Sequence, residues 1–258
     1  MSLHTTSYGD SGSRIVFLHG LFGQGRNWTQ HAKALASDHR VTLVDIPNHG
    51  RSVWTERWDF LEAADLVAEL IDADDPVALV GHSLGGKIAM VLALRHPELV
   101  ERLCIVDVAP VRYSSATEFG GYIDAMLAID LDALESRGDA DEALLEAVPS
   151  TTVRAFLLQN LRREAGTWSW QPHLRLLRDQ LSALSGWPAD DVVGLSPYEG
   201  TTLWIGGSES HYVKDEYADA MDALFPRTRR VTVKGAGHWV HSEKPEIFLE
   251  VLRRFVDG

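Results

Sequence analysis

The chain has 258 residues, of which 45% are apolar and 24% charged, a composition typical of a globular domain rather than a disordered one. Its 24 basic and 37 acidic residues leave a net charge of −13, which disfavours binding to nucleic acid or to an anionic membrane surface. No apolar stretch reaches about 18 residues, and the single Cys104 cannot form an internal disulfide. We therefore expect a cytoplasmic protein. The first residues lack a basic start followed by an apolar run, so no signal peptide is expected either. We expect a monomer or homodimer.

The first half of the chain alternates short apolar runs with helical patterns. Apolar runs that predict buried strands cover residues 14–18, 41–44, 77–80 and 103–106. Helical spacing lies between them, around residues 28–35, 59–71 and 84–95. This alternation predicts an α/β fold with a mostly parallel central sheet and helices on both faces. The functional loops of such a sheet lie at the carboxyl ends of its strands.

The alternation stops after residue 109. Helical patterns take over at residues 119–129, 139–148, 153–164 and 173–184, which predict an inserted helical cap over residues 110–197. Strands return at 202–205 and 230–233, and a last helix follows Pro245. The sequence therefore predicts a core made of residues 1–109 and 198–258.

A glycine-flanked serine stands between an apolar run and the helix that follows it. The segment Gly81–Gly85 fits the pattern Gly-x-Ser-x-Gly, in which a tight strand-to-helix turn exposes the serine hydroxyl. The same stretch resembles a phosphate-binding loop ending at Lys87, but Ile88 stands where that loop needs Ser or Thr for Mg²⁺. We interpret Ser83 as a nucleophile.

A serine hydroxyl becomes a good nucleophile only when a base takes its proton. His238 follows the last predicted strand, and Gly235 and Gly237 leave its loop free to bend toward the serine. His241 is the rival, although its position near the terminal helix favours a surface role. The sequence predicts His238 as the base.

The negative charge of an acyl-transfer intermediate needs backbone N–H donors. One should come from Leu84, directly after the nucleophile, and the other from Leu21 or alternatively Phe22, after the first strand. We choose Leu21. His19 in the same loop is expected to brace it by hydrogen bonds.

Two positions compete for the acid that orients the base. Asp107 lies at the end of an apolar run, and Glu209 lies in the loop after residues 202–205. His19, His49, His82 and His238 could gather at the same sheet edge. No metal-binding spacing supports such a site, so neither a metal nor a cofactor is predicted.

Together these motifs resemble the YbfF-type esterases of the α/β-hydrolase superfamily. The segments that carry the resemblance, over about residues 14 to 256, are His19–Gly23, Asp45–Ser52, Gly81–Lys87, Val106–Pro110 and Gly237–His241. The resemblance implies Asp107 as the acid, with Ser210 as its hydrogen-bonding support and Glu209 as the runner-up. It also implies a small-molecule substrate, a short to medium acyl ester or a thioester.

Two other functions remain open at this point. An acyltransferase would use the same acyl-enzyme and deliver the acyl group to an alcohol or thiol instead of water. A non-catalytic binding protein could share the fold, since fold alone does not fix function. Epoxide hydrolysis or dehalogenation would need a carboxylate at position 83, so Ser83 argues against both.

Overall fold

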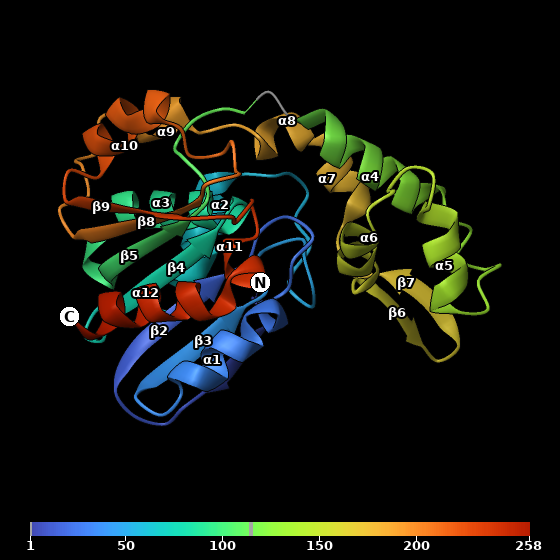
Figure 1. Cartoon of the computed structure of the whole chain (residues 1–258), viewed down its shortest axis with the longest axis horizontal. Coiled ribbons are helices and arrows are strands. Elements are labelled where there is room, and N and C mark those ends of the chain that lie inside the picture. The colour runs from blue at the N-terminus through green and yellow to red at the C-terminus, as the bar shows by residue number, and fades with distance from the viewer. Residues whose placement is uncertain (1, 114–115) are drawn as a thin grey trace.

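The computed structural model describes residues 2–113 and 116–258 (Figure 1). Residues 1, 114 and 115, which belong to the predicted core and cap, lie outside the described part. The term "cap" denotes residues 110–197.

A large twisted sheet forms the centre of the molecule. Its strands are β1 (Thr5–Tyr8), β2 (Ser13–Leu18), β3 (His39–Val44), β4 (Val77–His82), β5 (Val100–Val106), β8 (Thr201–Gly207) and β9 (Thr228–Val233). Their order is β1-β3-β2-β4-β5-β8-β9; β1 pairs antiparallel with β3, and the other neighbours are parallel. The predicted α/β fold is confirmed. β1 was not predicted, because Thr5–Tyr8 carries none of the apolar pattern of a buried strand.

Helices cover both faces of this sheet. They are α1 (Thr29–Leu35), α2 (Phe60–Ala68), α3 (Leu84–Arg95), α10 (Ala218–Leu224), α11 (Val240–Glu243) and α12 (Pro245–Asp257), with the 3-10 turns η1 (Gly25–Trp28), η2 (Pro97–Leu99) and η3 (Asp215–Tyr217). Alternate side chains of β2 pack on opposite faces of the sheet, because successive side chains of a strand point in opposite directions. Ile15 and Phe17 join the apolar cluster of α1 and α12, while Val16 and Leu18 join that of α2 and α3.

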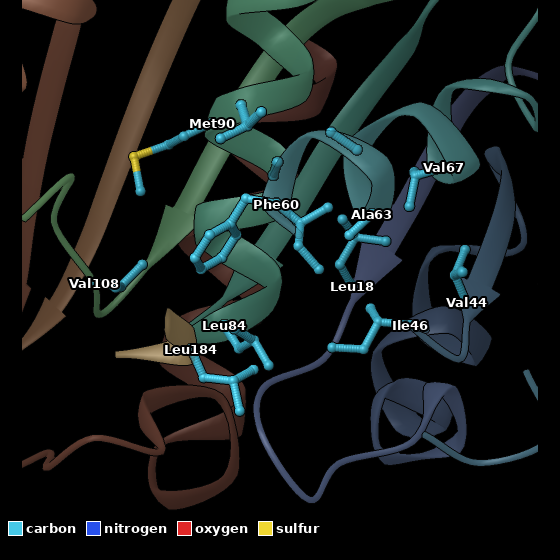
Figure 2. Packing of buried hydrophobic residues seen from close by; sticks show 14 of the residues in the cluster. Leu18, Val44, Ile46, Phe60, Ala63, Val67, Leu84, Met90, Val108 and Leu184 are labelled. Carbon is cyan, nitrogen blue, oxygen red and sulfur yellow. The ribbon is translucent and has the colours of Figure 1, made fainter. Parts of the chain in front are cut away.

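The cluster beneath α2 and α3 continues into the cap. Figure 2 shows Phe60, Ala63 and Val67 of α2 packed over the sheet together with Leu84 and Met90 of α3. Leu184, from the cap, belongs to the same buried cluster. The helix that begins directly after Ser83 therefore packs against both the sheet and the cap.

The cap lies between β5 and β8 in the chain, and most of it extends to one side of the sheet (Figure 1). Its elements are α4 (Ala116–Ala128), α5 (Arg137–Leu144), α6 (Thr151–Leu158), β6 (Leu161–Glu164), β7 (Thr167–Trp170), α7 (Leu174–Asp179), α8 (Leu181–Leu184) and α9 (Ala189–Val192). Among the described residues, no helix is long and apolar enough to cross a membrane.

A β-hairpin in the cap replaces part of a predicted helix. The helix expected over 153–164 ends at Leu158, and β6 pairs with β7 antiparallel. Ala165 and Gly166 connect the strands with φ of 49° and 90°, and positive φ at both turn residues is what a tight two-residue hairpin requires. The sequence signal for this hairpin was the pair Trp168 and Trp170, which alternate with polar residues directly after Gly166.

Candidate functional site

Ser83 occupies the sharp turn between β4 and α3. Its φ of 51° and ψ of −118° are unusual for a residue with a side chain. A Cβ at position 81 would lie 2.4 Å from the carbonyl oxygen of Gly85, and one at position 85 would lie 2.5 Å from that of His19. Both positions therefore require glycine, which explains the spacing of the motif.

A continuous chain of hydrogen bonds starts at the Ser83 hydroxyl. Ser83 Oγ lies 3.0 Å from His238 Nε2, and His238 Nδ1 lies 2.7 Å from Asp107 Oδ2. With a proton on Nδ1, the ring donates to Asp107 and accepts from Ser83. The structure thus brings together Ser83, His238 and Asp107, three residues far apart in sequence.

Asp107 is fully buried and its carboxylate is surrounded by donors. Oδ1 accepts from the backbone N–H of Gly207 at 3.0 Å, and Oδ2 accepts from the hydroxyl of Ser210 in addition to His238. Glu209 is exposed, and its carboxylate lies close to Gly235, where the ammonium group of Lys244 also lies. Of the two candidate acids, Asp107 is the one that contacts His238.

The loop that carries His238 is fixed on both sides of the histidine. The carboxylate of Glu243 accepts from the backbone N–H groups of Gly237 at 2.8 Å and Trp239 at 3.2 Å. His82 Nε2 donates to the carbonyl oxygen of His238 at 2.9 Å, and the ring of Tyr212 stacks on His238 at 4.1 Å between centroids. The sequence did not predict the roles of Glu243 and Tyr212 or this bond of His82. The signal for Glu243 was an acidic residue close after the predicted base.

His241 is buried, and the expectation of a surface role for it is wrong. Its ring stacks on Trp28 at 4.2 Å and meets His82 edge-on at 4.6 Å. Burial lowers the pKa of His241 to about 3, with the neighbouring His31 acting in the same direction, so the ring is neutral near pH 7. The short α11 turns this residue into the interior instead of toward solvent.

The loop after β2 is braced by His19, as expected. His19 Nδ1 donates to the carbonyl oxygen of Gly20 at 2.8 Å, and Nε2 accepts the backbone N–H of Ile46 at 3.1 Å. Burial lowers the pKa of His19 to about 4, so this neutral form persists near pH 7. Phe22 has a φ of 62°, and its carbonyl oxygen accepts from the side chain of Asn160 in the cap at 2.7 Å.

Two small, mostly apolar cavities meet at Ser83. One of about 40 Å³ includes Leu21 and Leu84 in its wall, so both predicted oxyanion residues lie beside the hydroxyl. Leu84 is the first residue of α3, and the first N–H groups of a helix have no acceptor within it. The other cavity, of about 20 Å³, is bounded by His238 and Trp239.

The aromatic and long apolar side chains of the cap divide into two groups. Those that line one or both cavities are Tyr113, Phe119, Tyr122, Phe156, Leu157, Leu181 and Leu184. Trp168 and Trp170 instead donate their indole N–H groups to the carbonyl oxygens of Leu134 and Met126 within the cap. Among residues 2–113 and 116–258, no group of three His, Cys, Asp or Glu side chains is placed to hold a metal ion.

The chain is similar to known proteins over nearly its whole length. Residues 13–245 match the family model described as alpha/beta hydrolase fold. The chain is 37% identical to the mouse sn-1-specific diacylglycerol lipase ABHD11, covering 94% of this chain and 80% of that one. It is 31% identical to the Escherichia coli esterase YbfF, covering 95% and 93%. A solved marine microorganism esterase superposes with a TM-score of 0.93 at 29% identity, covering 98% of this chain and 99% of that one.

The turn at Ser83 makes a prediction about stability. Gly85→Ala places a Cβ against backbone atoms of Leu18 and His19, at 2.7 and 2.5 Å, so unfolding free energy should fall by about 1–3 kcal/mol. The control is Gly121→Ala on α4, where no heavy atom lies within 4 Å of the new Cβ and stability should hold or rise. Urea unfolding measures both. Equal stability of the Gly85 variant and the unaltered protein would contradict the packing argument.

Proposed function

The chain belongs to the α/β-hydrolase fold family and is a serine ester hydrolase, and from this premise we propose that it is a carboxylesterase acting on short to medium acyl esters. The observation that carries the proposal is the hydrogen-bonded chain from Ser83 through His238 to Asp107. Such a chain supplies a nucleophile, a base and a group that orients the base.

The proposed reaction has two halves that pass through a covalent acyl-enzyme. Ser83 Oγ attacks the ester carbonyl while His238 Nε2 takes the hydroxyl proton, and the C–O bond to the alcohol breaks as His238 returns that proton to the leaving oxygen. In the second half His238 activates a water molecule, which attacks the acyl carbonyl and releases the carboxylic acid and free Ser83. The backbone N–H groups of Leu21 and Leu84 are our candidates for stabilising the negatively charged oxygen in both halves.

The site's surroundings support a neutral ester with a short acyl group. The two cavities beside Ser83 are narrow and bounded mainly by apolar side chains. The mouse relative is described as a diacylglycerol lipase and the E. coli relative as an esterase, so acylglycerols join simple esters as substrates to test. Ethyl ester formation in the presence of ethanol, at the expense of free acid, would assign the chain to acyl transfer instead.

Ser83→Ala tests the proposed nucleophile directly. Removal of the hydroxyl should lower kcat for nitrophenyl butyrate on the order of a million-fold, as in other serine hydrolases. A fluorophosphonate probe should label the unaltered protein at Ser83 and leave the variant unlabelled. Unchanged circular dichroism and Tm would show that the fold is intact. Labelling at a different serine would refute the assignment.

His238→Ala and His241→Ala separate the two histidines. The first should abolish turnover, because the Ser83 hydroxyl loses its acceptor 3.0 Å away. The second should lower Tm, since it opens a cavity against Trp28, while kcat measured well below Tm stays within a few-fold of normal. Both variants are assayed at one temperature, at equal concentrations of folded protein judged by circular dichroism. Loss of turnover in the His241 variant alone would reverse the roles.

Asp107→Asn should cost about 10⁴-fold in kcat, because the imidazole loses the carboxylate that fixes its tautomer and stabilises its charged form. The matched control is Glu209→Gln, which removes an exposed carboxylate from the adjoining loop and should change kcat little. Steady-state kinetics on purified variants decide between them. Near-normal turnover of Asp107→Asn together with a dead Glu209→Gln would transfer the role of acid to Glu209.

A further inference from the structure

A buried lysine on α3 has no part in the proposed chemistry. Lys87 is 2% exposed, and its backbone N–H donates to the carbonyl oxygen of Ser83 at 3.1 Å. Its Nζ donates to the carbonyl oxygens of Val111 and Ser185, each at 3.0 Å, and to that of Gly186. One side chain therefore satisfies three backbone acceptors outside its own helix.

These three carbonyl groups belong to two segments of the cap, one before α4 and one after α8. Val111 lies where the chain enters the cap after β5, and Ser185 and Gly186 lie where it leaves α8. The backbone N–H of Tyr113 also donates to Ser185 at 3.0 Å, so the two connections run side by side at Lys87. The lysine thus fastens the segment before α4 and the segment after α8 to the helix that begins after Ser83.

An ammonium group suits this position, because it has three N–H donors and no acceptor. Burial, assisted by the charge of Arg112, lowers the pKa of Lys87 to about 7. The three carbonyl oxygens act in the opposite sense, since the neutral amine keeps only two N–H groups. Residues 181–184 of α8 carry no titratable side chain, so this helix offers the Lys87 ammonium no carboxylate. Its partners next to α8 are backbone carbonyl groups.

The same side chain bounds the cavity beside the nucleophile. Lys87 and Ser185 line the space of about 40 Å³ together with Ser83, Leu184 and Tyr113. Nζ also lies 4.7 Å from the centroid of the Tyr113 ring. Any shift of the cap relative to α3 at this point must change the dimensions of the cavity.

Tyr113 continues the connection toward the base. Its hydroxyl donates to the carbonyl oxygen of Tyr212 at 2.6 Å, and the Tyr212 ring stacks on His238. The path from Lys87 to His238 consists of packed and hydrogen-bonded groups throughout.

We propose that Lys87 is a positioning residue that fixes the cap segments before α4 and after α8 against the nucleophile helix and thereby limits the length of the acyl group accepted beside Ser83. The part concerning acyl length rests on the proposed esterase function; the attachment of the cap does not.

Lys87→Met tests the effect on specificity, with kcat and KM measured on nitrophenyl acetate, butyrate and octanoate. Loss of the attachment should raise KM for the acetate and butyrate roughly tenfold, the equivalent of one hydrogen bond to a charged group, with kcat within about threefold. KM for the octanoate should stay level or fall, which shifts the preference toward longer chains. Lys33→Met, at an exposed position of α1, is the control and should keep the original preference.

Hydrogen–deuterium exchange tests the attachment independently of catalysis. Peptides spanning 109–113 and 181–187 should exchange roughly tenfold faster in Lys87→Met, while those of β4 and β5 stay protected. Fluorophosphonate titration gives the fraction of intact sites. If Lys87→Met does not fold, Lys87→Gln, which retains an amide donor, takes its place. Unchanged exchange in both of these cap peptides, or an unchanged chain-length preference in intact enzyme, would overturn the proposal. Absence of labelling at Ser83 would overturn the esterase function alone.

Discussion

The burial of the Asp107 carboxylate is the constraint on which the arrangement of the site depends. Burying a charged group away from water costs free energy unless hydrogen bonds and an oppositely charged partner compensate for the lost hydration. Here the compensating donors come from the end of β8 at Gly207, from the following loop at Ser210, and from the loop after β9 at His238. These segments are held in place because each supplies part of what the carboxylate needs.

The sheet also stabilises two strained residues, which directly follow the carboxyl ends of β4 and β5. Ser83 and Asp107 both have a φ of 51°, a conformation that costs roughly 1–2 kcal/mol for a residue with a Cβ. The backbone N–H of Ser83 donates to Val106 and that of Asp107 to Ile205, at 3.0 and 2.9 Å. The pairing of the strands therefore extends to the strained positions, and the rigid sheet fixes the direction of both side chains.

Elements and residues whose structure depends on a single local pattern could be predicted from the sequence. Apolar runs located β2 to β5, and the flanking glycines identified Ser83 because only their missing side chains allow the turn. Local pattern could not choose between Asp107 and Glu209, since the distance to His238 depends on how β5, β8 and β9 lie side by side. The bonds of Glu243 to Gly237 and Trp239 were missed, because they depend on how the backbone of the turn folds around the histidine. His241 was misjudged because its burial follows from contacts with Trp28, more than 200 residues earlier in the chain.

The position of the cap in the chain has a consequence for folding. Because the cap is inserted between β5 and β8, Ser83 and His238 are 155 residues apart, and Asp107 and His238 are 131 apart. Contacts of such high sequence separation form late, after the entropy of closing the intervening loops has been lost. A partly folded chain in which β2 to β5 have paired contains the serine turn but lacks the histidine. The hydrogen bond between Ser83 and His238 is thus a property of the completed sheet, and a chain whose last strand has not yet paired cannot form it.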